Sequence, residues 1–476
     1  MKIFNPYKSI FFLSIGITLL LTGCKKDPEP EPEPGLPEEI LVLNNWIWDG
    51  MNDLYLWEEF IPNLDPEYEE DPEAFFYRLL YKDDKDSWIT DDYEALIASF
   101  EGVDLATGMS VSPGLIDDTR VISIVEYVTP NTPASDSGIV RGDIIIAIDG
   151  QALTRDNYFD LYYQATATFG FGSFDGVNPV PDGREVTLTA VELNLNPFVH
   201  HELIDYEGVK IGYCVYTSFV PGPADEWMDE IYTVLGEFQE AGVTDVVIDL
   251  RYNGGGYGYV CEQMASVLAP ENVVSNHSIF STQIWNEGYT QYWKEADLDE
   301  DGEPDGEESW RLLSRFPDTD LNLNLSRVYI LTTNRTASAS EMLIVGLDPH
   351  MDVIQIGAST YGKCYGSVTI PDLEDPKRHN WAMQPIVLKY ANADGFTDFV
   401  NGLGPDFIVE DLLLYATPFG SLGDPLLAKA LEQITGVAPG VRKSVSTEMF
   451  FERIPVPRRQ IPELKLDWPL KPVSSN

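Results

Sequence analysis

A serine and a lysine, Ser338 and Lys363, are the residues whose surroundings best fit covalent chemistry. Ser338 lies where an apolar strand pattern gives way to a helix pattern. At a helix start, free N–H groups and the helix dipole favour a developing negative charge. A lysine can act as a base only where burial lowers its pKa, and Lys363 follows an apolar strand among glycine and aromatic residues. The two residues therefore predict a nucleophile and its base.

Three glycines end a further apolar strand in the segment DLRYNGGG, residues 249–256. Glycine lets backbone N–H groups approach a substrate closely. In a parallel sheet, the loops at the carboxyl ends of the strands gather where active sites form. Taken alone, each of these features has an ordinary structural explanation. Ser338 and Glu341, for example, also match a helix capping box. The weaker alternative is a histidine base, from His200, His201 or His350.

From residue 201 the pattern alternates between strands and helices, which predicts an α/β fold with mainly parallel strands. The expected strands are 210–219, 243–252, 327–333 and 352–359, and the expected helices are 224–242, 257–269, 339–347 and 424–434. We expect this unit to span residues 201–436, with an insertion at 270–325. Residues 437–476 form a Pro-rich tail of uncertain order.

The N-terminal half contains two further units. Residues 40–103 show apolar spacing typical of helices, with Asp71 and Pro72 placed to open one of them. Its tryptophans are expected to pack a helical cap, the alternative being a ligand groove. Residues 104–200 are rich in strands and turns. A short helix pattern, the sequence RGDIII and an Asp-Gly turn follow one another there, and together they resemble a PDZ domain.

The segments DLRYNGGG, NRTASASEM and STYGKCYG resemble carboxyl-terminal processing peptidases, with the serine 25 positions before the lysine. GLGPD at 402–406 matches a further motif of that family. The resemblance implies a crotonase-like (ClpP/crotonase) α/β core with a PDZ domain, and serine endopeptidase activity through a Ser–Lys dyad without a cofactor. It maps the nucleophile to Ser338, the base to Lys363 and the oxyanion donors to the N–H groups of Gly255 and Ala339.

The PDZ resemblance implies that a substrate tail adds as a strand to a sheet edge, with its carboxylate held by one loop. That loop maps to Thr107, Gly108, Met109 and Ser110. The alternative is a PDZ fold whose groove is blocked. At the level of the whole chain, the competing hypotheses are a non-catalytic protein that binds peptides or lipophilic ligands and a scaffold without chemistry.

Two features depart from the family pattern. Family members often carry a glutamine four residues after the lysine, whereas Ser367 stands there, so Ser367 is the candidate for the third catalytic role. Cys364 beside the lysine is unusual. Two alternatives remain for it, a disulfide with Cys261 or two free thiols.

An acidic run in the expected insertion matches the spacing of a calcium loop. Its candidate ligands are Asp297, Asp299, Asp301, Glu303 and Glu308. The alternative is a solvated acidic loop. Calcium would order the insertion and take no part in the chemistry.

The net charge of -48 argues against binding of nucleic acid. Residues 1–23 combine basic residues, a short apolar run and the sequence LTGC, which resembles a bacterial lipoprotein signal with Cys24 as the lipidated residue. The alternative is an ordinary secretion signal. Residues 24–39 alternate Pro and Glu and predict an extended spacer. We therefore expect a lipid-anchored protein of the bacterial cell envelope, periplasmic or on the outer-membrane surface, that acts on proteins or peptides.

Overall fold

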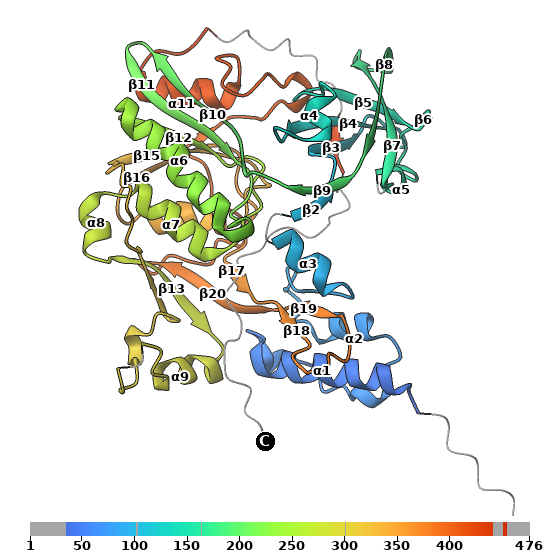
Figure 1. Ribbon diagram of the computed structural model, residues 1–476, viewed down its shortest axis with the longest axis vertical. Coiled ribbons are helices and arrows are strands. Elements are labelled where there is room, and N and C mark those ends of the chain that lie inside the picture. The colour runs from blue at the N-terminus through green and yellow to red at the C-terminus, as the bar shows by residue number, and fades with distance from the viewer. Residues whose placement is uncertain (1–34, 101–102, 163, 300, 441–450, 455–476) are drawn as a thin grey trace, which may run out of the picture.

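The computed structural model describes residues 35–100, 103–162, 164–299, 301–440 and 451–454. In Figure 1 the α/β core lies on the left, the PDZ-like sheet at the upper right and the N-terminal helices at the lower right. The expected signal segment, Cys24 and most of the tail and spacer lie outside the described residues. Within the described residues, no helix combines the length and apolarity needed to cross a membrane.

The main sheet of the core has the strand order β10-β11-β12-β15-β16-β21. These strands are Phe198–Tyr206, Val209–Tyr216, Asp245–Asp249, Arg327–Thr332, Asp352–Gly357 and Phe407–Ile408. From β11 to β21 all neighbours are parallel, as the alternating pattern predicts. Every residue of β12 is buried, because helices cover both faces of a parallel sheet.

Four long helices cover this sheet: α6 (Glu226–Ala241), α7 (Gly258–Leu268), α10 (Ala339–Leu347) and α11 (Pro425–Thr435). The apolar side of α11 packs in one cluster with β11, β12 and β15. The buried residues of α6, α7 and α10 belong to a second, larger cluster. The sheet therefore separates two hydrophobic cores, and the loops that carry Ser338 and the glycines leave its carboxyl edge.

A second sheet has the order β14-β13-β20-β17. Its strands are Leu313–Arg315, Ile279–Trp285, Ile386–Asn392 and Tyr365–Ser367, and the short helices α8 (Glu271–Ser275) and α9 (Glu287–Glu295) flank β13. Five residues of β13 pair with β20, so the segment predicted as an insertion contributes an inner strand of the core. Sequence analysis showed no sign of this pairing, because a partner strand about 100 residues away leaves no local signal.

The N-terminal helices pack with a small sheet that combines one N-terminal strand with two strands from the second half of the chain. They are α1 (Glu38–Leu54), α2 (Pro72–Leu79) and α3 (Tyr93–Phe100). The carboxylate of Asp71 caps α2 by accepting the N–H of Ala74, as predicted. The sheet has the order β1-β19-β18, with strands Trp88–Thr90, Ala382–Gln384 and Ile370–Pro371. Trp46, Trp48 and Trp57 are partly buried against the larger core cluster, which supports the packing interpretation.

The PDZ-like unit is built on a sheet in the order β22-β3-β4-β5-β7-β8, with β6 paired to β5. In chain order its strands are Met109–Leu115, Val121–Val128, Ile144–Ile148, Gln151–Ala152, Thr166–Phe174, Pro179–Thr189 and Glu452–Arg453, and its helices are α4 (Pro133–Asp136) and α5 (Tyr158–Tyr162). Positive φ values at Asp149 and Gly150 confirm the predicted tight turn between β5 and β6. Strands β2 (Val103–Ala106) and β9 (Val191–Asn194) form a separate pair.

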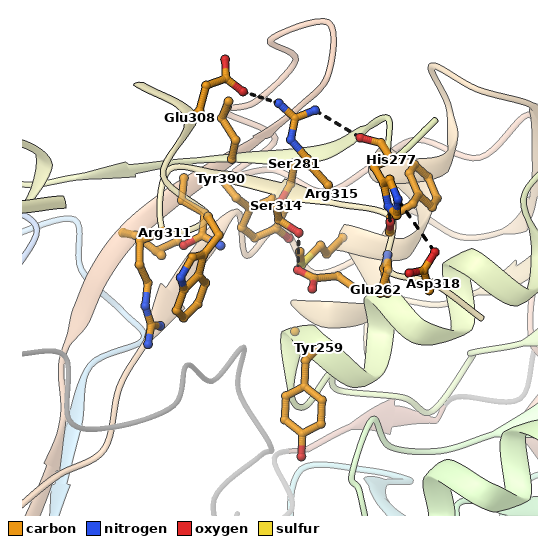
Figure 2. A pocket seen from close by; sticks show the side chains of 18 residues that line it. Tyr259, Glu262, His277, Ser281, Glu308, Arg311, Ser314, Arg315, Asp318 and Tyr390 are labelled. Carbon is orange, nitrogen blue, oxygen red and sulfur yellow. Dashed lines mark hydrogen bonds and ion pairs between the residues drawn. The ribbon is translucent and has the colours of Figure 1, made fainter. Parts of the chain in front are cut away.

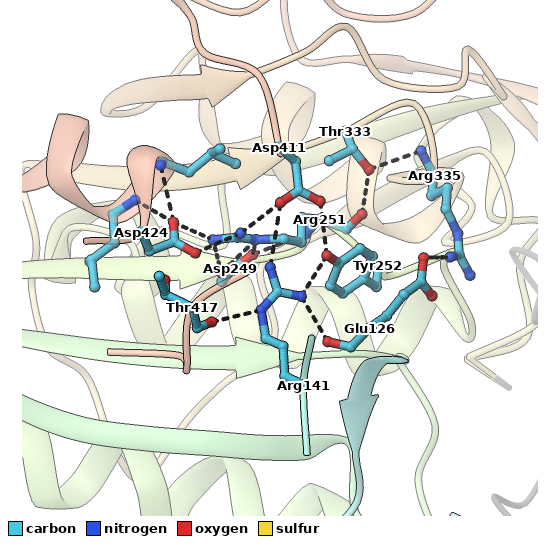
Figure 3. Close-up of polar contacts among 12 residues, drawn as sticks. Glu126, Arg141, Asp249, Arg251, Tyr252, Thr333, Arg335, Asp411, Thr417 and Asp424 are labelled. Carbon is cyan, nitrogen blue, oxygen red and sulfur yellow. Dashed lines mark hydrogen bonds and ion pairs between the residues drawn. The ribbon is translucent and has the colours of Figure 1, made fainter. Parts of the chain in front are cut away.

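Buried charges join the PDZ-like sheet to the core (Figure 3). From the PDZ-like unit, the Arg141 guanidinium donates to the hydroxyl of Tyr252 at 2.7 Å and lies 3.4 Å from Asp411. Glu126 of β4 forms an ion pair with Arg335, three residues before Ser338. The PDZ-like unit is thus held by the same loop that carries the expected nucleophile.

Candidate active site

Ser338 occupies a strained position at the entrance of α10. Its backbone has φ 59° and ψ −115°, and its side chain is fully buried. A non-glycine residue in such a region costs about 1–3 kcal/mol, and such residues cluster at active sites. Strand β15 ends six residues earlier and α10 begins directly afterwards. The strand-to-helix transition predicted from the sequence therefore presents this residue on a sharp turn.

One carboxylate ties the serine and lysine segments together. Oε2 of Glu341 accepts the N–H groups of both Ser338 and Lys363, each at 2.8 Å. Oε1 accepts the N–H of Gly362 at 2.7 Å and the hydroxyl of Thr360. Burial raises the pKa of Glu341, although these four hydrogen bonds oppose the shift. The contact to Ser338 matches half of the capping box, and the same side chain also fixes the backbone of Lys363.

Tyr390 of β20 holds the same two residues from their carbonyl side. Its buried hydroxyl lies 3.1 Å from the carbonyl oxygen of Ser338 and 3.0 Å from that of Lys363. The structure therefore brings the backbones of Ser338 and Lys363 together, and Lys363 is only 4% exposed. Sequence analysis missed Tyr390, because it lies on a strand whose pairing depends on long-range contacts.

Replacing Glu341 by glutamine is expected to lower kcat about 100-fold, because a charge-assisted bond contributes roughly twice a neutral one. The glutamine side-chain NH₂ group would also face backbone N–H groups that now donate to the Glu341 carboxylate, and two donors repel each other. Steady-state cleavage of a fluorogenic protein substrate measures the effect. Tyr390→Phe removes only a hydroxyl and serves as the milder comparison, with a loss of about tenfold. Unchanged kcat in Glu341→Gln would contradict the positioning role.

The glycine loop packs directly against Ser338. Gly255 has φ 114°, and a Cβ there would lie 2.8 Å from Cβ of Ser338 and 3.0 Å from N of Ala339. Only glycine allows this approach. The N–H of Gly255 donates to Oδ1 of Asn253 at 2.8 Å. Gly255 and Ala339 thus flank the serine, and a substrate oxyanion would compete with Asn253 for the Gly255 N–H.

Ser367 is fully buried and is held by a glutamine that sequence analysis missed. Nε2 of Gln384, in β19, donates to Oγ of Ser367 at 3.1 Å, and Oε1 of the same amide accepts the hydroxyl of Thr369 at 2.8 Å. An amide therefore lies next to the position where family members often carry glutamine.

The described cysteines, Cys214, Cys261 and Cys364, are free thiols. The disulfide alternative for Cys261 and Cys364 was therefore wrong, and the free-thiol alternative is confirmed. The thiol of Cys261 donates to the carbonyl of Ala339 at 3.2 Å. Burial raises the pKa of the Cys364 thiol to about 11, which disfavours the reactive thiolate.

A pocket of about 470 Å³ lies between α7, α10 and the second sheet (Figure 2). Met342 and Tyr390 line it, so it reaches side chains within one helical turn of Ser338. Burial raises the pKa of Glu262, on its wall, to about 7, although the Ser314 hydroxyl donates to this carboxyl at 2.5 Å. Oγ of Ser281 is buried there without a hydrogen-bond partner among the described residues. The pocket therefore combines an apolar floor with groups able to hydrogen-bond a ligand.

The acidic loop differs in detail from the predicted calcium set. Asp297, Asp299 and Asp305 place one oxygen each within 4.8 Å of one another. Glu308 instead forms an ion pair with Arg315, and Oδ1 of Asp301 accepts the N–H of Glu303. Asp305 takes part because the loop folds back, its N–H donating to the carbonyl of Ala296. Calcium binding stays a prediction, with Asp305 added to its candidate ligands.

The predicted carboxylate-binding loop, residues 107–110, leads into β3. Gly108 has φ 88°, and a Cβ there would lie 2.1 Å from the Thr132 hydroxyl oxygen. Ser110 donates its hydroxyl to Glu126 at 3.0 Å. Since Glu126 pairs with Arg335, this loop is connected to the loop of Ser338 through two side chains.

Sequence profiles decide the family. The profile described as peptidase family S41 matches residues 210–409, the S41 N-terminal domain matches residues 43–92, and a PDZ domain matches residues 124–162. The chain belongs to peptidase family S41. The first of these matches includes Ser338, Lys363 and the glycine loop, and the third runs from within β4 through α4 and β5 of the PDZ-like unit.

Several proteins are similar to this S41 peptidase. The carboxyl-terminal-processing protease of Synechocystis is 24% identical over 345 residues, which cover 71% of each chain. The chloroplastic carboxyl-terminal-processing peptidase 2 of Arabidopsis thaliana is 27% identical over 170 residues, 34% of this chain but only 32% of that protein. A crystal structure of a Bacteroides fragilis protein assigned to the S41 proteases is 26% identical with a TM-score of 0.67, covering 82% of this chain and 97% of that one.

Proposed function

We propose that this S41 peptidase is a serine endopeptidase with a Ser338–Lys363 dyad. The observation that carries the proposal is the double clamp, in which Glu341 bonds the N–H groups of both residues and Tyr390 their carbonyl groups. Ser338 attacks the peptide carbonyl, and Lys363 accepts its proton and returns it to the leaving amine. The N–H groups of Gly255 and Ala339 stabilise the oxyanion.

Ser367 takes the third role in this proposal. It lies four residues after Lys363, and its hydroxyl is fixed by the buried amide of Gln384. A hydroxyl whose hydrogen bonds are fixed can orient a neighbouring amine without taking part in the chemistry. Gln384 is then a positioning residue that acts through Ser367.

The PDZ-like unit selects substrates by their C-terminal tails. Support comes from the loop at residues 107–110, which leads into β3 of the PDZ sheet. An unfolded protein ending in apolar residues should be cleaved faster than the same protein with an amidated C-terminus. Mass spectrometry of the fragments measures both rates and locates the cleavage sites. Absence of cleavage of any unfolded protein would contradict the proposed activity, whereas equal rates would contradict only tail selection.

The pocket beside Met342 and Tyr390 is proposed to hold a substrate side chain close to the scissile bond. Glu262, whose carboxyl lines this pocket, should make the free energy of unfolding depend on pH. The raised pKa of Glu262 means that its stabilising contribution is complete below the unfolded value and is lost as pH rises through about 7.

Relative to Glu262→Gln, the wild-type free energy of unfolding should therefore fall by about 3 kcal/mol between pH 4.5 and pH 8. Urea unfolding of both proteins across this range measures the difference. A difference that does not change with pH would contradict the titration of this carboxyl.

The remaining elements of the proposal concern location and metal. Cys24 is the proposed lipidation site, followed by the Pro/Glu spacer, and both support a proposed location at the bacterial envelope. The reaction needs no cofactor, and calcium at the acidic loop would act on stability alone.

A further inference from the structure

A short piece of the C-terminal segment lies on the edge of the PDZ sheet. Strand β22 pairs antiparallel with β3, so that Glu452 lies opposite Leu115 and Arg453 opposite Gly114. The N–H of Ile454 donates to the carbonyl of Pro113 at 3.1 Å. Because β4 pairs with the other edge of β3, β22 takes the edge that remains.

Side chains fix the segment on both faces of the sheet. Ile454 packs against the PDZ core cluster, as do Tyr158 and Tyr162 of α5. Phe451 packs on the opposite face with Ile122 and its neighbours. Its ring lies 2.4 Å from the point where a Cβ on Gly114 would stand, so the glycine makes room for the ring.

This edge is the one that a tail would use. Strand β3 starts at Met109, inside the loop predicted to bind the carboxylate, and a PDZ ligand adds as a strand beside it. Being antiparallel, β22 runs from the level of Leu115 toward Pro113, and therefore toward that loop. A substrate tail ending at the loop would run in the same direction and meet the same backbone groups.

We propose that residues 451–454 are a built-in occupant of the peptide-binding edge and compete with substrate tails for it. The proposal rests on the tail recognition proposed above. It gives the protease a resting state in which the PDZ-like unit is engaged by its own chain.

The contacts between residues 451–454 and the PDZ-like unit are few enough for a substrate tail to displace this segment. Only two residues are paired as a strand, and Pro113 of β3, opposite Ile454, has no N–H to donate back to this segment. The Arg453 guanidinium lies 3.5 Å from Asp411, a carboxylate that Arg251 and Arg141 already neutralise. A longer tail with a free carboxylate would offer more backbone bonds and a contact to the loop.

The test measures binding of a dye-labelled peptide, with an apolar C-terminus and a free carboxylate, to the full chain carrying Ser338→Ala. Fluorescence anisotropy should give a Kd about tenfold lower for Ile454→Asp, because the edge is then unoccupied. Phe451→Ala should change the Kd in the same direction. Glu452→Gln is the matched control, since this side chain is exposed, and should leave the Kd unchanged. In chains with intact Ser338, Ile454→Asp should lower KM with little change in kcat.

The possible results of this binding experiment distinguish the proposed competition from the proposed tail recognition. If all variants bind the peptide with the same Kd, the competition is overturned while tail recognition stands. If no variant binds the peptide, both are overturned. A synthetic peptide with the sequence of residues 449–456 should displace the dye-labelled peptide from the Ile454→Asp chain, and failure to do so would also overturn the proposal.

Discussion

Replacing Ser338 by alanine is expected to lower kcat by about four orders of magnitude or more, because no other group can form the acyl bond. Binding should survive, since Ser338→Ala removes one buried oxygen and leaves the bond from the Ser338 N–H to Glu341 in place. Single-turnover cleavage of an unfolded protein measures the loss, and the Kd of a tail peptide measures what remains. Lys363→Ala should give a loss of similar size, and the double variant should lose little more.

Ser340 provides a matched control two residues away. Its hydroxyl donates to the carbonyl oxygen of Asn253 at 3.1 Å, so Ser340→Ala should cost stability and less than about tenfold in kcat. Full activity of Ser338→Ala, or loss of activity in Ser340→Ala alone, would overturn the assignment of the nucleophile. Equal activity of Lys363→Ala and wild type would remove the base from the mechanism.

Removing the guanidinium of Arg251 is expected to destabilise the fold by about 3–5 kcal/mol. Its side chain has no exposed area and bonds three carboxylates, those of Asp249, Asp411 and Asp424 (Figure 3). Burial raises the pKa of Asp411, but the charges of Arg251, Arg141 and Arg453 outweigh this and hold it below its usual value. In Arg251→Met the three carboxylates would lose their central cation.

Urea unfolding in the Ser338→Ala background measures the free energy of unfolding without self-cleavage. Arg78→Ala is the control, because Arg78 pairs with Glu69 at the surface and is 54% exposed, so its loss should cost less than about 1 kcal/mol. If Arg251→Met and Arg78→Ala lowered the free energy of unfolding equally, Arg251 would not be the main stabilising cation of this cluster. Since Asp411 also meets the PDZ-like unit, Arg251→Met should in addition loosen the attachment of that unit.

Sequence analysis predicted most of the chemistry-bearing segments, because their signals are local. The alternation from residue 201 onward predicts parallel strands, and β11, β12, β15 and β16 form that arrangement. The short turns of the PDZ-like unit were equally predictable from Asp149-Gly150, because tight turns with positive φ are limited to a few residue types.

Long-range contacts account for what sequence analysis missed. The residues expected to be an insertion supply β13, which pairs with β20, and β20 in turn carries Tyr390 to the backbone of Ser338. Glu341 matches a capping residue in sequence, yet its second contact lies 22 residues away, at Lys363. Gln384 approaches Ser367 from a separate strand.

By itself, the sequence determined which residue types stand at the strand ends and in what order, since period and turn chemistry depend on neighbours a few positions apart. The tertiary structure alone decided which distant groups clamp Ser338 and Lys363, and that Ile454 and Phe451 lie on the PDZ edge. A two-residue strand before a proline has too few local contacts to be recognised in sequence. It forms because packing against β3 and two preformed apolar clusters stabilises it.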